Sequence, residues 1–137
     1  MIGRMNHVGI AVPTIEQGLA VWRDLLGGVA GEPFDLPAQG VRVCFVDAPN
    51  VQVELIAPLG AESPIVGFLA RNPAGGQHHV CFEVADLDAA IAEMIAKGAR
   101  VLGAPRIGAH GTMVVFLHPR DCGGVLVELM EAPGAGH

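Results

Sequence analysis

The sequence predicts an α+β fold made of two tandem βαβββ modules, and two kinds of observation support this. The segment 6–12 returns at 78–84, and the segment 51–56 returns at 125–130, so His79 follows His7 by 72 residues and Glu128 follows Glu54 by 74. Within each copy the apolar residues change from a period of two to helical spacing and back. We expect a curled, partly open, barrel-like mixed sheet with its helices outside.

The first module covers about residues 5–58. Its expected elements are, in order, a strand over 6–12, a helix over 15–26, an irregular link over 28–37 and strands over 41–47 and 51–57. The helix is predicted by apolar residues at helical spacing, which we assign to the core: Ile15, Leu19, Trp22, Leu25 and Leu26. The link contains Gly and Pro, which favour a short or irregular strand. A middle pair of segments supports the repeat, because Gly40–Phe45 aligns with Gly111–Phe116.

A linker helix over about 63–72 joins this module to a second one over about 77–131. Serine is a favoured N-cap residue and proline is favoured at the first position of a helix, so Ser63 and Pro64 predict where this helix begins. The helix should end before Asn72 and Pro73. The second module predicts a strand over 78–84, a helix over 87–97, a short strand near 100–102 and strands over 113–118 and 124–131. We treat residues 1–137 as one domain with a flexible tail over 133–137.

Composition excludes several classes of function. The formal charge is −6 and the eight basic residues are scattered, which is unlike a nucleic-acid-binding surface. Apolar runs are much shorter than the roughly 20 residues of a membrane span. The three cysteines, Cys44, Cys81 and Cys122, are an odd number in scattered contexts, and no secretory leader precedes the first strand. We therefore expect a cytoplasmic protein that binds neither nucleic acid nor membrane.

Alternation along the strands indicates which polar side chains face inward. Val8, Ile10 and Val12 share the face that packs on the helix, which leaves His7 on the other face. The same reasoning selects His79, and not His78, as its equivalent. It also places Glu54 and Glu128 on the face away from their apolar neighbours.

A carboxylate within so apolar a strand costs free energy unless it is paired or binds a metal. A single strand His or Glu is more often structural, but the duplicated set favours ligands. Two imidazoles and two carboxylates suit Co²⁺, Mn²⁺, Ni²⁺, Zn²⁺ or Fe²⁺, with two positions open for an oxygen-donor substrate. The sheet is therefore expected to curl around a metal cleft, where the ion acts as a Lewis acid.

Several longer segments resemble the methylmalonyl-CoA epimerase family of the vicinal oxygen chelate (glyoxalase/bleomycin resistance/dioxygenase) superfamily. The similar segments run almost from end to end: Asn6–Pro13, Glu54–Gly60, Ser63–Leu69, Gly75–Val80, Ile107–Gly111 and Phe116–Asp121.

The resemblance implies a function and a set of site residues. The metal ligands would be His7, Glu54, His79 and Glu128, with Co²⁺ as the first choice of metal. The reaction would interconvert (2R)- and (2S)-methylmalonyl-CoA by α-proton abstraction and reprotonation through a metal-stabilised enolate. Glu128 would be the catalytic residue, the partner an acyl-CoA substrate, and the assembly a homodimer.

Two features leave alternatives open. Some epimerases carry a second, non-ligand glutamate on the strand that here contains Arg42, Val43 and Cys44, so another group, such as Gln77, Glu83, His110 or a metal-bound water, would have to act as the second acid or base. A glyoxalase I-type isomerase shares the four-ligand pattern. Glu54 and the absence of tyrosine count against an extradiol dioxygenase, and five Phe with one Trp are few for a metal-free drug-binding module.

Overall fold

The computed structural model describes residues 1–133, and the chain divides into two compact units. The first unit contains residues 7–78. The second unit contains residues 1–6 and the chain from His79 onward. The expected tail over 133–137 lies outside the described residues except for Pro133.

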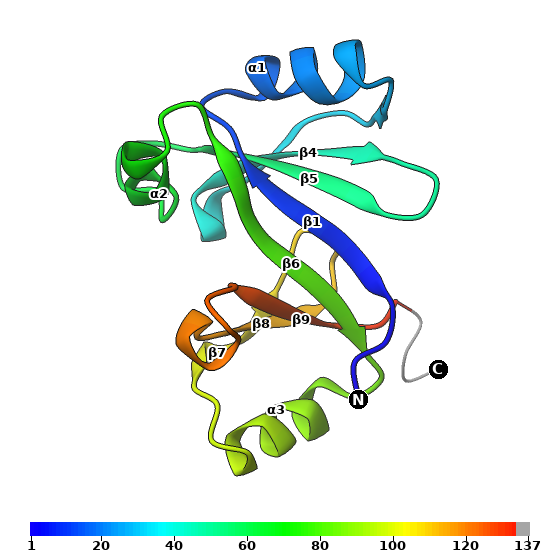
Figure 1. Cartoon of the computed structure of the whole chain (residues 1–137), viewed down its shortest axis with the longest axis vertical. Coiled ribbons are helices and arrows are strands. Elements are labelled where there is room, and N and C mark those ends of the chain that lie inside the picture. The colour runs from blue at the N-terminus through cyan, green and yellow to red at the C-terminus, as the bar shows by residue number, and fades with distance from the viewer. Residues whose placement is uncertain (134–137) are drawn as a thin grey trace. The chain divides into compact units, whose positions relative to one another are not determined.

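The first unit follows the predicted order of elements, with the link divided into two short strands (Figure 1). Its elements are β1 (Met5–Ala11), α1 (Ile15–Leu19), the π-helix η1 (Ala20–Leu25), β2 (Val29–Ala30), β3 (Phe34–Leu36), the 3₁₀-helix η2 (Pro37–Gln39), β4 (Val41–Asp47), β5 (Gln52–Pro58) and α2 (Val66–Arg71). The strands pair in the order β2-β4-β5-β1, with β3 also on β4. β1 and β5 are parallel, and the other pairs are antiparallel.

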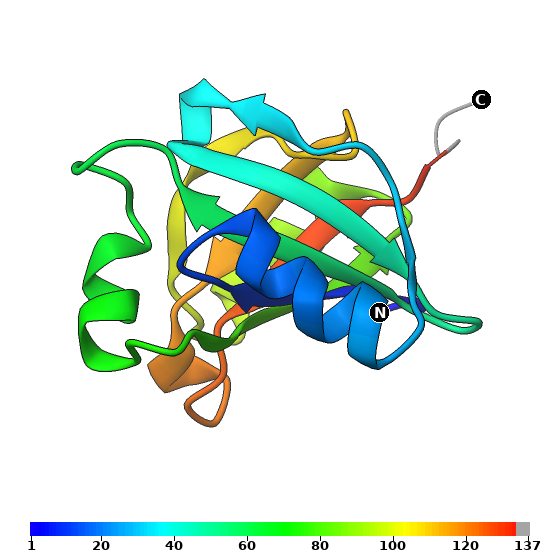
Figure 2. The same cartoon turned by 90° about the horizontal axis from the view of Figure 1, so that it is seen from above.

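The helix that follows β1 covers one face of this sheet (Figure 2). It begins where the Thr14 side chain accepts a hydrogen bond from the Gln17 N–H at 3.1 Å, as an N-cap does. The buried core beneath it comes from alternate strand positions and one helix stripe: Ile10, Val12, Ile15, Leu19, Cys44, Val46, Val53, Leu55 and Ala57. The opposite face of β1 and β5 is thereby left to His7 and Glu54.

Two expectations for this unit are wrong in detail. The helix passes into π-helical turns after Leu19, and Leu25 and Leu26 are 75% and 61% exposed rather than in the core. The wider π turn changes which residues share a face, so helical spacing misplaces them. Ser63 is not an N-cap either, because its carbonyl oxygen accepts the Val66 N–H in a turn and α2 begins only after Ile65.

The second unit contains the second βαβββ module, which has the predicted order. Its elements are β6 (Gly76–Val84), α3 (Leu87–Ala96), β7 (Val101–Ile107), β8 (Met113–Leu117), the 3₁₀-helix η3 (Pro119–Asp121) and β9 (Val127–Glu131). The strands pair in the order β6-β9-β8-β7, with β6 and β9 parallel. The side chain of Asp86 caps α3 by accepting the Ala89 N–H at 3.0 Å.

The helix of the second unit packs on β7 and β9. Its core is again formed by alternate strand residues and the helix: Val84, Leu87, Ala90, Val115, Leu117 and Leu129, with Phe82 packed against them. The start of the chain pairs with the end of β6, since the Gly3 N–H donates to the Glu83 carbonyl oxygen at 2.7 Å. The Glu83 N–H in turn donates to the carbonyl oxygen of Arg4.

The two pairing orders confirm the α+β class and the mixed, open sheet. Each order is open and combines one parallel pair with antiparallel pairs, β2-β4-β5-β1 in the first unit and β6-β9-β8-β7 in the second. β7 is longer than expected and β9 is shorter. In the described part of the chain, no helix is long and apolar enough to cross a bilayer.

Candidate metal centre

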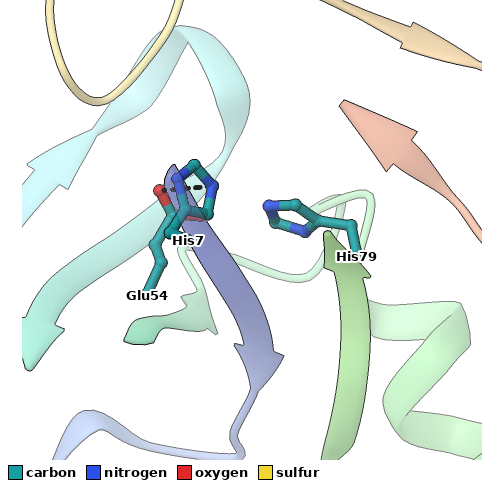
Figure 3. Close-up of side chains that lie close together, drawn as sticks. All are labelled: His7, Glu54 and His79. Atoms are coloured by element: carbon teal, nitrogen blue, oxygen red, sulfur yellow. Dashed lines mark ion pairs between the residues drawn. The ribbon is translucent and has the colours of Figure 1, made fainter. Parts of the chain in front are cut away.

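The first unit places His7 beside Glu54. His7 lies near the start of β1 and Glu54 in the middle of β5, where Gly9 is the parallel partner of Glu54. The two side chains are buried, with residue exposures of 1% for His7 and 7% for Glu54. Figure 3 shows their ion pair as a dashed line, which joins His7 Nε2 to Glu54 Oε2 over 3.7 Å.

The second unit repeats this arrangement with His79 and Glu128. His79 lies on β6 (Figure 3), and Glu128 lies on β9, where Cys81 is its parallel partner. Exposure is 4% for His79 and 7% for Glu128. His79 Nε2 lies 3.3 Å from Glu128 Oε1. Each histidine is therefore two residues before the strand partner of its glutamate, in both units.

Period two predicted these faces correctly. In β6, Phe82 and Val84 pack in the core under α3, whereas Cys81 belongs to a separate buried cluster with Val114 and Met130. His79 lies two residues before Cys81 on the same strand, so the two side chains point to the same face of the sheet. His78 is only half-buried, and its ring packs edge-on against Phe68 at a centroid distance of 5.3 Å. The choice of His79 over His78 as the equivalent of His7 agrees with these positions.

The residues in each pair fit a divalent metal. Two donor atoms on one ion with bonds of about 2.1 Å cannot be more than about 4.2 Å apart. Both imidazole–carboxylate distances, 3.7 and 3.3 Å, satisfy this limit. Buried carboxylates and imidazoles are donors that Co²⁺, Zn²⁺ and their neighbours accept. Each unit thus offers one nitrogen and one oxygen donor of a type that could hold a divalent metal.

Each glutamate also stands opposite a phenylalanine on the antiparallel side, a feature that we did not predict. Phe45 on β4 pairs with Glu54, and Phe116 on β8 pairs with Glu128. Directly opposed residues of an antiparallel pair share a face and lie close together. The sequence contained a signal for this, because the repeat aligns Phe45 with Phe116, but strand register was needed to place them beside the glutamates.

Both rings have an aromatic neighbour. Phe116 packs against the imidazole of His79 with ring centroids 5.5 Å apart and planes at 82°, an edge-to-face contact. Phe45 lies 5.7 Å from Phe34 of β3 with planes at 48°. An aromatic ring therefore touches a candidate ligand directly in the second unit.

Other candidates for the second acid or base have different surroundings. The Glu83 carboxylate is buried, accepts a hydrogen bond from Asn6 Nδ2 at 2.9 Å and lies 3.6 Å from Arg4 Nε. Gln77 is exposed, and His110 lies half-buried in the turn between β7 and β8. Glu83 therefore anchors the chain start, which argues against its use as a mobile base.

Three other polar side chains, Arg42, Cys44 and His118, have structural surroundings. Arg42, on the strand where some epimerases carry a second glutamate, donates from Nε to Asp35 at 2.7 Å. Burial raises the pKa of the Cys44 thiol, which lies in the core under the helix. His118 Nδ1 accepts the Arg120 N–H at 3.1 Å, as a strand-end hydrogen-bonding residue does.

Comparison with known proteins gives a consistent result. The model of the Glyoxalase/Bleomycin resistance protein/Dioxygenase superfamily matches residues 6–116. The ethylmalonyl-CoA/methylmalonyl-CoA epimerase of Cereibacter sphaeroides is 56% identical over 133 residues, which is 96% of this chain and 99% of that protein. This chain belongs to the methylmalonyl-CoA epimerase family.

Solved structures agree with this membership. The crystal structure of methylmalonyl-CoA epimerase from Mycobacterium tuberculosis has a TM-score of 0.88 and 33% identity, covering 97% of this chain and 91% of that one. A methylmalonyl-CoA epimerase solved in complex with methylmalonyl-CoA and NH₄⁺ also has a TM-score of 0.88, with 33% identity and 98% coverage of both chains. The family likeness therefore extends over nearly the whole chain.

Proposed function

We propose that this protein is a metal-dependent epimerase that interconverts (2R)- and (2S)-methylmalonyl-CoA. The observation that carries the proposal is the duplicated buried imidazole–carboxylate pair, found in a chain of the epimerase family. An epimerase must make the α-carbon acidic and then move a proton. A ligand set with carboxylates next to open coordination positions serves both needs.

The metal would be held by His7, Glu54, His79 and Glu128 as one set, with Co²⁺ as the ion we propose. When bound, the ion supplies positive charge for the negative charge that develops on the thioester oxygen of the substrate. Burial of all four side chains excludes water and strengthens such electrostatic interactions. The apolar residues behind them hold the donors in place.

Glu128 is the residue that we propose moves the proton. Its carboxylate takes the α-proton, and the electron pair of the broken C–H bond passes into the thioester carbonyl. A second acid on the opposite face returns a proton to the same carbon and gives the other epimer. Glu128 then releases its proton to solvent and the second acid regains one, so no external reactant is consumed. Glu54 has the equivalent position in the first unit, but we assign it to metal binding alone.

The test is α-proton exchange in D₂O. Co²⁺-loaded protein with (2R)-methylmalonyl-CoA should incorporate deuterium and produce the 2S epimer, and both signals should disappear with EDTA and in Glu128→Gln. The absence of exchange in fully metal-loaded wild-type protein would reject the epimerase function. The hemithioacetal of glutathione and methylglyoxal would then be the next substrate, because a glyoxalase I-type site shares the ligand pattern.

We also propose that the protein acts in a reducing cytoplasm and as a homodimer. All three cysteines are thiols rather than disulfides in the described part of the chain. Large apolar residues are exposed between η1 and β2, over residues 21–29: Val21, Leu25, Leu26 and Val29. Exposed apolar residues that gather in one patch are typical of a protein interface. Light scattering should give the mass of a dimer, and a monomer mass would reject this assembly.

A further inference from the structure

Phe116 contacts one candidate ligand of the second unit and stands opposite the other in the strand register. Its ring meets the His79 imidazole edge to face at 5.5 Å, and its backbone position on β8 is directly opposite Glu128 on β9. His79 and Glu128 are themselves 3.3 Å apart. The three side chains therefore form one contiguous group on the face of the sheet that lies away from α3.

Buried side chains border this group on one side. Val114 and Met130, one pleat further along β8 and β9, pair with each other and are buried with Cys81. Phe116 cannot shift toward them without displacing well-packed side chains. The half-buried Phe116 ring thus has little freedom to move away from the imidazole on that side.

A fixed ring limits the motion of the histidine. Rotation of an imidazole about its outer side-chain bond is otherwise broad, because this torsion has weak preferences. Edge-to-face contact at 82° favours one orientation of the two planes. Hydrogen-bonding groups that orient a metal ligand typically change metal affinity by about 10–100-fold when removed, and we expect the lower end of this range for a packing contact.

We propose that Phe116 is a positioning residue that orients His79 for metal binding. The inference rests on the proposed metal site and extends it to a residue that is not a ligand. An aromatic ring is the essential property, because a flexible side chain of similar volume fills space without imposing an orientation. Phe45 has the equivalent strand position in the first unit and lies against Phe34.

The test compares Phe116→Leu and Phe116→Met, which remove the ring, with Phe116→Tyr, which keeps it. Phe82→Leu is the matched control, because Phe82 lies in the same unit on the opposite face and packs in the core under α3. Co²⁺ affinity is measured by competition with a chelating dye, and the visible absorption spectrum of bound Co²⁺ reports ligand geometry. Thermal unfolding of each metal-free variant shows that it is folded.

We expect Co²⁺ binding about 10-fold weaker and an altered spectrum in Phe116→Leu and Phe116→Met. Phe116→Tyr should restore the wild-type spectrum, and Phe82→Leu should lower stability while keeping both the affinity and the spectrum. Wild-type spectrum and affinity in both ring-less variants, or equal losses in Phe82→Leu, would reject the positioning role. Failure of the wild-type protein to bind Co²⁺ would instead reject the proposed metal site itself.

Discussion

The two imidazole–carboxylate pairs have the same strand positions but different neighbours. Glu54 lies between Gly9 and Phe45 in the strand register, whereas Glu128 lies between Cys81 and Phe116. Gly9 contributes no side chain beside Glu54, whereas Cys81, beside Glu128, is fully buried. The imidazole–carboxylate distance is 3.7 Å in the first unit and 3.3 Å in the second.

The comparison bears on the two roles that we propose for the duplicated module. The repeated backbone keeps one histidine and one glutamate on the same face of each unit, as a shared metal would require. The residues that flank the two glutamates differ. We therefore expect the two units to contribute similarly to metal binding and differently to proton transfer.

The largest effect should separate the two glutamates. Glu128→Gln should lower the rate of α-proton exchange by about 10³-fold, because an amide cannot accept the proton. Glu54→Gln keeps an oxygen donor for the metal. At saturating Co²⁺ its exchange rate should therefore fall by only about 10-fold, as expected when a group at a metal site is altered. Both rates come from NMR-detected exchange in D₂O. Equal losses in the two variants would show that the units share the catalytic role.

A second prediction concerns the glycine that leads into β6. Gly75 has a φ of +93°, and a β-carbon there would collide with the carbonyl oxygen of Ala11. Gly27 and Gly98, which follow the two equivalent helices, also have positive φ but open space around them. Gly75→Ala should lower the free energy of unfolding by about 2–3 kcal/mol, and the other two substitutions by about 1 kcal/mol each.

Denaturant unfolding of the three glycine variants checks this order. Similar losses at Gly27 and Gly98 would support the equivalence of the modules. A loss at Gly75 no larger than theirs would contradict the steric argument, because left-handed backbone strain would then explain all three values.

The smallest effect should come from surface ion pairs. Asp121 accepts hydrogen bonds from the Arg100 backbone N–H, Nε and Nη2, which lower the pKa of its carboxyl from 3.8 to about 2. In the first unit, Asp35 accepts one from Arg42 Nε, and its pKa is also lowered. Asp121→Asn should lower Tm slightly at pH 7, and Asp35→Asn less, because exposed pairs contribute little.

The pH dependence of this effect has a definite sign. A carboxyl with a lowered pKa stabilises the folded state above its unfolded pKa of 3.8, and the contribution disappears as the pH falls through about 2. The Tm difference between wild type and Asp121→Asn should therefore be constant near neutral pH and shrink between pH 4 and 2. A difference that grows in this range would contradict the assigned cause.

Much of the site followed from local patterns. Alternation alone placed His7, Glu54, His79 and Glu128 away from the helix-packed face, because the side-chain period of a strand does not depend on distant residues. The repeat then selected His79 over His78. The π-helical turns near Leu25 and the turn at Ser63 were missed, because their hydrogen bonding is decided by packing that helical spacing does not encode.

The cross-strand partners of the glutamates could not be predicted from the sequence, for a different reason. The pairing of Phe116 with Glu128 depends on the register of β8 and β9, which the intervening segment with η3 sets. The link over 28–37, where a short or irregular strand was expected, contains the two short strands β2 and β3 on β4. The aligned phenylalanines at 45 and 116 were visible in the repeat, yet their position beside the glutamates required the observed register.

The central claim is that the two pairs act together as one metal centre, and metal stoichiometry tests it most directly. Metal-free protein is titrated with Co²⁺ and the bound ion is counted by elemental analysis, for the wild type and for His7→Ala and His79→Ala. We predict one tightly bound ion per chain, with affinity reduced by at least about 100-fold in either variant. Two ions per chain, or one ion held undiminished after either substitution, would show that the pairs bind separately and would contradict the claim.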